Sequence, residues 1–592
     1  MQRKITELAR LTQAKTKAMT KLSMVTVGAS LLSFVGALAT AQKAVEAQES
    51  KPNLVMFIAD DMGYADMGAY GSEINTPVMD SMAQNGVMFT NFRTGSECSP
   101  SRSMMLTGVD NHRAGLGQML EKLYPNQEGK PNYEGVINDR VVTMPTVLQD
   151  AGYNTYWVGK WHLGGAEEGH GRPPHELGFG RTFGMLEGGG DHYTVRAFAP
   201  GVADSHYIYD GEPTELPDDF FTSKSFTDAM IDFVNEGQDS GNPFFAFMAY
   251  MAPHVPLQLP DKDLVKKYEE IYAAGWDEIR AQRFERQQEL GIIPGYLELP
   301  PRWPGVTAWD TLTPEQQRIE AKKMALYAAM IEDLDREMGR FMDHLKDIGE
   351  YDNTIFLFIT DNGADGHDRA SSARYQQWFK DVGISTAYED MGQGNSFVTR
   401  GLNWTQVSAT PFWGQKASVT EGGIRGEFTL FAPGLIDSGT RTAAFASVMD
   451  IMPTFLDYAG VEHPGDTYNG QPIHPMMGRS MRPLLEGTAE AIYAPDEPIG
   501  FETGGDVNDA LFMGDWKLLR IAPSEGEEWG DSTWKLFNLT MDPRELHDLS
   551  DMYPELCNQM VEHYKQYLTD MGYVPGNPPE GSLETMRSCT ED

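Results

Sequence analysis

Two uninterrupted apolar runs, each followed by acidic or amide side chains, constrain the fold of this chain more than any other feature. The first lies in NLVMFIADDMG and ends at Asp60 and Asp61, and the second lies in NTIFLFITDNGAD and ends at Asp361 and Asn362. A short apolar run without alternation is typical of a strand buried on both faces, as in a parallel sheet. Open α/β sheets bind their ligands outside the carboxyl ends of the strands. The two runs therefore predict a parallel sheet with a polar site at the ends of two strands.

Helix signals alternate with these runs. The dipeptides Thr76-Pro77 and Thr313-Pro314 each place an N-cap residue before a proline at the first helical position. The second helix carries apolar residues at steps of three and four, so one face packs on the sheet: Tyr327, Ile331, Leu334, Met338, Phe341, Leu345 and Ile348. The alternation of strands and helices predicts a doubly wound sheet with helices on both faces.

The last hundred residues have a different pattern. After the proline-rich break APDEPIG come two short strand-like segments, DALFMGDWKLLRIA and TWKLFNLTMDP, and then a helix over residues 554–571. This pattern predicts a smaller antiparallel α+β domain. Two further stretches, residues 260–312 and 363–412, are long and weakly periodic. We expect them to be loops that wall the site, because long loops in compact domains are often functional.

The N-terminus has the composition of a targeting segment. Six basic residues precede LSMVTVGASLLSFVGALA, and ATA at 39–41 offers a cleavage site, with VEA ending at Ala47 as a second choice. We expect residues 1–41 to be a signal peptide, and the mature protein to be periplasmic or secreted without stable membrane association. An uncleaved anchor is the alternative, since about 18 apolar residues can just span a bilayer.

Charge and cysteine content restrict the partners. Acidic residues number 86 against 47 basic ones, for a formal charge of −39. This balance argues against nucleic acid, whose phosphates require a basic surface, and an anionic substrate would need local cations at its site. Of the three cysteines, Cys557 and Cys589 lie close together in the sequence and could pair after export, which would leave Cys98 alone.

The four polar residues at the strand ends form a candidate metal site. Asp60, Asp61, Asp361 and Asn362 offer only oxygen donors, which suit Ca²⁺ or Mg²⁺. Adjacent acidic residues after a strand are often turn formers or helix caps instead. Two such pairs on equivalent strand ends favour the metal interpretation.

Cys98 opens the segment CSPSR, in which Pro100 indicates a helix start and Arg102 lies near the first turn. A helix start collects backbone N–H groups and attracts an anion. A lone cysteine is usually an inert buried thiol, but the neighbours here are polar. Elsewhere, Lys160 and His162 stand two apart after a strand-like run, so both could point to one side.

Two more candidates are isolated in the sequence. His254 follows the apolar run FFAFMAYMA, and Lys416 lies in a glycine-rich segment. Taken singly, each lysine is an ordinary surface charge and each histidine an ordinary polar residue. Together with Lys160 and His162 they supply two cations and two imidazoles, which suits the hydrolysis of an oxyanion ester.

These segments resemble the motifs of a known family. CSPSR followed by LTG is similar to the sulfatase signature, GKWHLG to the second sulfatase signature, and IADDMG, APHVPL, TDNGAD and GQKASVTEGGIRGEF follow in family order. The resemblance is to the formylglycine-dependent sulfatases, in particular the bacterial arylsulfatase branch of the alkaline phosphatase superfamily. It implies an α/β fold with a large mixed, mostly parallel sheet sandwiched by helices, a catalytic domain over 48–495, and an α+β subdomain with an antiparallel sheet over 496–592.

The resemblance also implies how the cysteine is used. A separate formylglycine-generating enzyme would oxidise Cys98 to Cα-formylglycine, whose hydrate would be the nucleophile. The same residue 98 would join Asp60, Asp61, Asp361 and Asn362 as a ligand of one Ca²⁺ ion, with Mg²⁺ as the less expected metal.

The remaining roles are implied in the same way. Arg102 would steady the hydrated aldehyde, and Lys160 and Lys416 would hold sulfate oxygens. His254 would be the general acid toward the leaving group, and His162 would assist the aldehyde and the breakdown of the sulfated intermediate.

The expected reaction is hydrolysis of sulfate esters, which releases inorganic sulfate and an alcohol or phenol. The substrate would be a sulfated small molecule or saccharide, with Gly188–Tyr193 and the 363–412 stretch as candidate leaving-group contacts. Two alternatives are a phosphodiester or phosphonate monoester hydrolase on the same scaffold, and a non-catalytic secreted binder of sulfated glycans.

Overall fold

The computed structural model describes residues 51–592, except 167–169, 434–435, 437–438, 505–506, 523–529, 531, 577–582, 584–585 and 590–592. The expected signal peptide at 1–41 lies outside the described residues. Among the residues that are described, no helix is both long and apolar enough to cross a bilayer.

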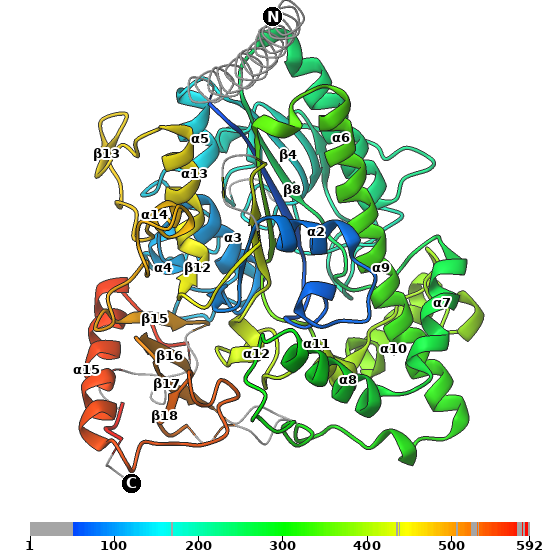
Figure 1. The fold of residues 1–592 in the computed structure, drawn as a ribbon. Coiled ribbons are helices and arrows are strands. Elements are labelled where there is room, and N and C mark those ends of the chain that lie inside the picture. Colours follow the sequence, from blue (N-terminus) through cyan, green and yellow to red (C-terminus); the bar gives the residue numbers. More distant parts are fainter. Residues whose placement is uncertain are drawn as a thin grey trace, which may run out of the picture. The chain divides into compact units, whose positions relative to one another are not determined.

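A ten-stranded sheet forms the centre of the fold, with the order β11-β2-β10-β9-β1-β8-β4-β5-β6-β7 (Figure 1). The five consecutive strands from β9 to β5 are parallel, and β10 and β6 run antiparallel on either side. Their bounds are β1 Asn53–Ala59, β2 Val87–Phe89, β4 Asn154–Lys160, β5 Arg181–Met185, β6 Tyr207–Tyr209, β7 Glu212–Pro213, β8 Phe244–Ala249, β9 Thr354–Thr360, β10 Phe428–Phe431 and β11 Thr440–Thr442. The mixed, mostly parallel sheet expected from the sequence is confirmed.

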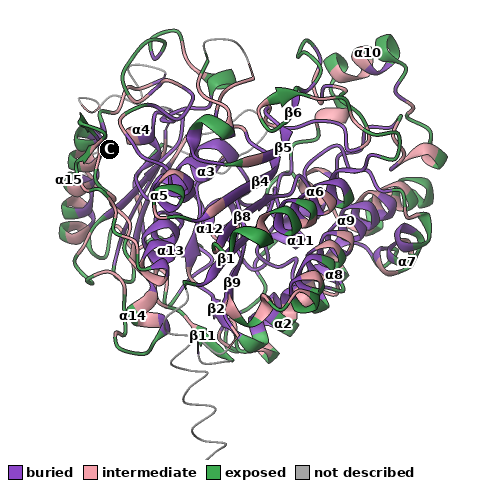
Figure 2. Ribbon diagram, turned by 90° about the horizontal axis from the view of Figure 1, so that it is seen from above, coloured by how far each residue is buried: buried purple, intermediate pink, exposed green. Residues whose placement is uncertain are grey.

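Helices cover both faces of this sheet, which explains the uninterrupted apolar runs. In β1, Val55 and Phe57 belong to one hydrophobic core, while Leu54 and Met56 belong to a second core on the other face. Figure 2 shows the buried strands between helices α6 and α9 on one side and α5 and α13 on the other. Since neither face meets water, every position in the strand is apolar.

The two helices expected from their N-caps, at Thr76 and Thr313, begin where the sequence indicates. A capping box at Thr313 starts α9. The helix ends at Asp347, and Ile348 is its C-cap. The longer helices are α2 Pro77–Asn85, α3 Cys98–Thr107, α5 Met144–Asp150, α6 Thr222–Gly237, α7 Lys262–Tyr272, α8 Trp276–Glu289, α9 Pro314–Asp347, α10 Ala373–Val382, α11 Gly401–Ser408, α13 Ile451–Ala459 and α15 Pro554–Met571. Shorter elements are α4 Asn111–Ala114, α12 Glu421–Ile424, α14 Arg482–Leu485, β3 Phe92–Arg93, β12 Ala446–Ser447, β13 Thr467–Tyr468 and β14 Gln471–Pro472.

The two stretches expected to be long loops contain helices, so that expectation is wrong. Residues 260–312 hold α7 and α8, and residues 363–412 hold α10 and α11. In α8 the buried face includes Arg280, Arg283 and Gln287, so its apolar period is interrupted although the face is packed. A helix that buries charged residues against partners from elsewhere in the chain has no clear hydrophobic period.

The C-terminal part is the expected smaller α+β unit. Four antiparallel strands, β15 Ile499–Glu502, β16 Asn508–Met513, β17 Trp516–Ile521 and β18 Lys535–Asn538, form one sheet in sequence order. Helix α15 packs on β16 and β17, and their buried side chains form a hydrophobic core separate from the two cores of the large sheet. The structure supports the fold class, and the boundaries at 48–495 and 496–592 stay a prediction.

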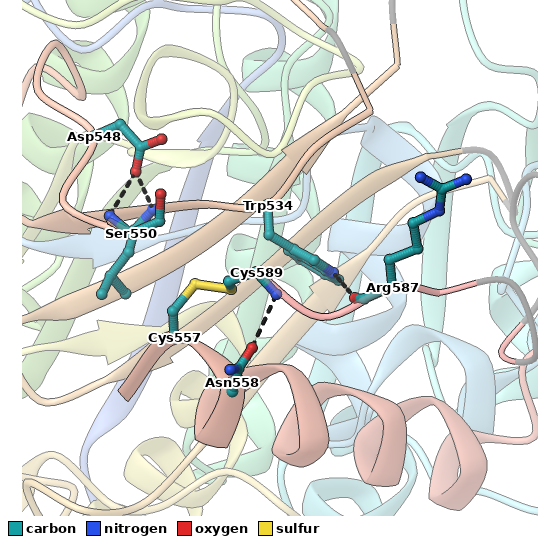
Figure 3. The surroundings of a disulfide bond; sticks show 8 residues. Trp534, Asp548, Ser550, Cys557, Asn558, Arg587 and Cys589 are labelled. Carbon is teal, nitrogen blue, oxygen red and sulfur yellow. Dashed lines mark hydrogen bonds between the residues drawn. A yellow bond between two sulfur atoms is a disulfide. The ribbon is translucent and has the colours of Figure 1, made fainter. Parts of the chain in front are cut away.

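A disulfide ties the end of the chain to the last helix. Cys557 in α15 is bonded to Cys589, and the neighbouring Asn558 side chain accepts a hydrogen bond from the Cys589 backbone N–H (Figure 3). Cys98 is the free cysteine, and it is buried. The pairing that the sequence left open is therefore formed in the structure.

Candidate active site

The register of the parallel strands brings the two acidic pairs together. Ala59 of β1 pairs with Thr360 of β9, so Asp60 and Asp361 leave the sheet side by side. The Asp61 backbone N–H donates to Asp361 Oδ1 at 3.2 Å. Ligand atoms of Asp60, Asp61, Asp361 and Cys98 all lie within 4.8 Å of one another, and all four residues are buried. The predicted convergence at the carboxyl ends of two strands is confirmed.

The oxygen atoms of this cluster fit a hard cation. Asp61 Oδ2 and Asn362 Oδ1 are buried, and neither accepts a hydrogen bond from the described residues. Such atoms are costly to bury without a partner. Burial and the neighbouring Asp60 raise the pKa of Asp361. Three carboxylates and an amide oxygen are the donors that Ca²⁺ and Mg²⁺ prefer, so these residues could hold either ion.

Cys98 is the first residue of α3 and faces the acidic cluster. Its Sγ lies 3.4 Å from Asp60 Oδ1 and 3.1 Å from Lys416 Nζ. Burial and the carboxylates of Asp361 and Asp60 raise the pKa of Cys98 well above its usual value. Reactive cysteines need the opposite, a lowered pKa in an electropositive setting. The unmodified thiol is therefore a poor nucleophile in this position.

Three buried cations neutralise the carboxylates. Lys160 Nζ lies 2.6 Å from Asp60 Oδ2, and Lys416 Nζ lies 2.6 Å from Asp61 Oδ1. Burial alone would lower the pKa of Lys160, but the Asp60 carboxylate raises it overall. Arg102 donates through Nε to Asp361 Oδ2 at 3.0 Å. The predicted cations are thus all at the site, with Arg102 bonded to the expected metal ligands.

The two histidines occupy different parts of the site. His254 is buried, its Nδ1 hydrogen-bonds with the Val255 carbonyl at 2.7 Å, and its Nε2 lies 3.6 Å from Asp61 Oδ2. Burial lowers the pKa of His254 well below its usual value, despite the opposing effect of Asp61. His162 lies beyond the end of β4 and pairs through Nε2 with Glu121 at 3.0 Å. Strand alternation does not govern its direction, because its φ is 59°.

Backbone conformations of low probability cluster here. Asp61, His162 and Ala417 all have positive φ values, of 67°, 59° and 70°. Outside glycine this region is costly, and strain of this kind concentrates at functional sites. Two of these residues are predicted site residues, and the third directly follows Lys416.

A cavity of about 420 Å³ opens above these groups. Of the predicted site residues it is lined by Cys98, His162, His254 and Lys416. Gly188 also lines it, and a Cβ atom there would lie 2.5 Å from His162 Nε2. The segment Gly188–Tyr193 was expected to contact the leaving group. It also contains His192, which is buried and hydrogen-bonded to Thr222 and to the His254 carbonyl.

Sequence reasoning missed several lining residues. Glu121, Phe198 and Val202 line the cavity, and none lies in a recognisable motif. Arg369, Arg374 and Tyr375 come from the 363–412 stretch that was expected to wall the site, whereas no residue of 260–312 lines the cavity. Only the folded chain brings these residues to the histidines.

Comparisons with known proteins agree with this geometry. A family model described as Sulfatase matches residues 52–461. An uncharacterized sulfatase of Schizosaccharomyces pombe is 36% identical over 545 residues, covering 89% of this chain and 95% of that protein. An arylsulfatase of Klebsiella aerogenes is 37% identical over 446 residues, covering 74% of this chain and 92% of that protein. The crystal structure of Ps i-CgsB in complex with k-i-k-neocarrahexaose has a TM-score of 0.60 at 24% identity, covering 90% and 96% of the two chains, which indicates the fold alone.

Proposed function

Because the chain belongs to the sulfatase family, whose members hydrolyse sulfate esters, we propose that it does so with a formylglycine made from Cys98 and with a bound Ca²⁺ ion. The products would be inorganic sulfate and an alcohol or phenol. The observation that carries this proposal is the position of the buried Cys98, whose Sγ lies between the Asp60 carboxylate and the Lys416 ammonium group. A buried thiol that stays protonated is a poor nucleophile, so we infer that Cys98 is converted to formylglycine.

We assign the metal to Asp60, Asp61, Asp361 and Asn362, together with residue 98. When bound, Ca²⁺ supplies positive charge to sulfate oxygens, and the hydrated aldehyde of residue 98 supplies a nucleophilic oxygen. The unpartnered oxygens of Asp61 and Asn362 support this assignment. Mg²⁺ is the alternative, since its donor preference is the same.

The lysines and the arginine position the charges. Lys416 Nζ lies within reach of both Asp61 and Cys98, so it can contact an oxyanion next to residue 98. Lys160 holds Asp60, and Arg102 holds Asp361 while it also donates to the Lys160 carbonyl at 3.0 Å. Donors held in place by buried partners need no rearrangement when charge develops in the transition state.

His254 is suited to give a proton to the leaving oxygen. Its Nδ1–H donates to the Val255 carbonyl, so the transferred proton would be carried on Nε2. Because burial lowers the pKa of His254, Nε2 would take up this proton only when the anionic substrate enters the cavity and favours the charged ring. His162 lines the same cavity and is oriented by Glu121, so it can assist at residue 98. These roles are proposals that rest on geometry and on the family.

A second protein is needed to make the nucleophile. Cys98 is 2% exposed, so we infer that a formylglycine-generating enzyme acts before the chain has closed around it. Export to the periplasm or the medium is proposed as well. The Cys557–Cys589 disulfide supports export, because such bonds persist in oxidising compartments.

The test is the chemistry of residue 98 in active protein. The tryptic peptide from Thr94 to Arg102 should have the mass of an aldehyde, react with an aldehyde reagent and resist thiol alkylation. Cys98→Ala should fold with an unchanged circular dichroism spectrum and lose activity toward 4-nitrophenyl sulfate.

Two outcomes would redirect the proposal. Retention of most activity by Cys98→Ala would place the nucleophile elsewhere. Faster turnover of a matched aryl phosphate diester than of the sulfate would favour a phosphodiesterase, and an unmodified Cys98 in protein from the native host would favour a non-catalytic glycan binder.

A further inference from the structure

The outer part of the cavity is built by two segments that are distant in sequence. Residues 198–202 contribute Phe198 and Val202, and the start of α10 contributes Arg374 and Tyr375. Arg374 Nη2 donates to the Pro200 carbonyl at 2.7 Å, which joins the two segments. This wall contains no predicted catalytic residue, so its side chains are free to select the leaving group.

Aromatic side chains in this wall lie next to the expected proton donor. The Phe198 ring centroid is 5.8 Å from that of His254, in an edge-on arrangement. Tyr375 lines the same wall. A leaving group whose oxygen meets His254 would therefore place its ring against Phe198, and flat apolar surfaces of this kind bind aromatic or sugar rings.

The charges of the lining residues are balanced, with one exception. Lys416 pairs with Asp61, Lys122 with Glu97 and Arg369 with Asp365. The lining carboxylate Glu121 pairs with His162. Arg374 has no carboxylate partner among the described residues, and the single hydrogen bond found for its guanidinium goes to the Pro200 carbonyl.

We propose that the cavity selects sulfate esters of a ring that carries a second anionic group, and that Arg374 binds this group. The inference rests on the proposed function, since it places the scissile sulfate at residue 98 and the ring between Phe198 and Tyr375. The second group is a carboxylate or another sulfate, both of which match the planar fork of an arginine.

The position of Arg374 supports a role in binding. It is the second residue of α10, where the helix dipole adds to its positive charge. The protein is strongly acidic, so most of its surface repels a dianionic substrate. The unpaired charge of Arg374 at the rim of the cavity would attract such a substrate locally.

The experiment compares two pairs of substrates, and the members of each pair differ in charge and little in shape. The full-length enzyme, with residue 98 converted, is assayed on 3- and 4-sulfooxybenzoate and on their methyl esters. In the wild type, kcat/KM should be higher for at least one carboxylate than for its ester. Arg374→Gln should reduce kcat/KM for that carboxylate about tenfold and leave the ester within about twofold.

Two further variants separate binding from other effects. Lys380→Gln removes a positive charge from the same helix at an exposed position outside the cavity, so it should leave the ratio of the two substrates unchanged. Arg374→Lys should restore part of the preference, because it keeps the charge. A monosulfated and a disulfated hexose, assayed in parallel, show whether the preferred ring is a sugar or an aryl group.

The failures are distinguishable. If the wild type cleaves the methyl esters but Arg374→Gln affects ester and carboxylate equally, or affects neither, then the inference is wrong and the proposed function stands. If the wild type with converted residue 98 cleaves no sulfate ester, the proposed function itself has failed.

Discussion

His254 is held so that one ring nitrogen bonds to the backbone and the other faces Asp61. Its Nδ1 bonds to the Val255 carbonyl, while His192 Nε2 bonds to the carbonyl of His254 itself at 3.1 Å. An added Cβ at Gly189 would lie 2.8 Å from His254 Cε1, so only glycine permits this approach of the backbone. The imidazole is therefore fixed before substrate arrives.

Replacement of His254 by alanine should affect poor leaving groups most. A leaving group that is stable as an anion needs no proton in the transition state, so activity on 4-nitrophenyl sulfate should fall less than about tenfold. Activity on an alkyl sulfate should fall by about 10² or more. His206→Ala, at an exposed histidine outside the cavity, is the control. Equal losses on both substrates would indicate that His254 binds substrate and transfers no proton.

Replacement of Asp361 by alanine should weaken metal binding. The variant loses one carboxylate ligand and removes the Asp361 partner of Arg102, so affinity for Ca²⁺ should fall at least about tenfold. Metal content by mass spectrometry and the Ca²⁺-dependent rise in Tm measure this directly. Asp352→Ala is the matched control, because Asp352 is exposed just before the opposite end of β9. Full activity of metal-free wild type would contradict the assignment.

Among the elements, the C-terminal sheet holds the segment that carries Lys416. Asn508 at the start of β16 donates to the Ala417 carbonyl at 2.8 Å and accepts from the Val419 N–H at 3.0 Å. Lys517 of β17 donates to the Val419 carbonyl and to Glu421. Ala417 has a φ of 70°, so the segment depends on these contacts to keep its conformation.

Asn508→Ala should therefore impair catalysis from outside the cavity. Loss of both hydrogen bonds should let residues 417–419 relax, which moves Lys416 and lowers kcat/KM for sulfate esters about tenfold. Inhibition by inorganic sulfate should weaken in parallel, which a general loss of stability would not produce. Asn538→Ala is the control in the same sheet, because among the described residues the Asn538 side chain bonds only to the nearby Met541 N–H. Unchanged kinetics in Asn508→Ala would show that residues 417–419 keep their conformation without the Asn508 hydrogen bonds.

At the scale of the whole molecule, buried charges join the C-terminal sheet to helix α4. His112 of α4 is buried between Asp110 at 2.8 Å and Glu502 of β15 at 3.0 Å. Burial alone would lower the pKa of His112, but its hydrogen bonds to Asp110 and Glu502 raise it to about 10. The protonated histidine thus stabilises the contact between α4 and the C-terminal sheet.

The stability of the protein should then depend on pH through His112. The folded pKa of about 10 lies above the unfolded value of 6.5, so this contribution is complete below about pH 6.5 and disappears as pH rises through 10. The free energy of unfolding should fall by roughly 2–5 kcal/mol over this range. His112→Gln should lower stability at pH 7 and flatten the dependence, while His547→Gln at an exposed histidine should do neither. If the free energy of unfolding depends on pH in the same way in wild type and in His112→Gln, this account is contradicted.

Much of the fold could be predicted because its signals are local. The apolar runs of β1 and β9 and the N-caps at Thr76 and Thr313 each follow from a few adjacent residues. The family resemblance of the motifs is confirmed by the match over residues 52–461. Helix α8 was missed because its buried arginines find their partners far away, as Arg283 does at Asp66.

The sequence by itself determined the class of fold and the family, and it predicted a catalytic set, since these depend on residue type and on order along the chain. Only the tertiary structure decided that Arg374 meets Pro200, that Asn508 holds the Lys416 segment and that Cys557 bonds to Cys589. Each of these contacts joins residues that local propensity does not relate. Their distance depends on how whole elements pack, which is a property of the assembled core and of no single segment.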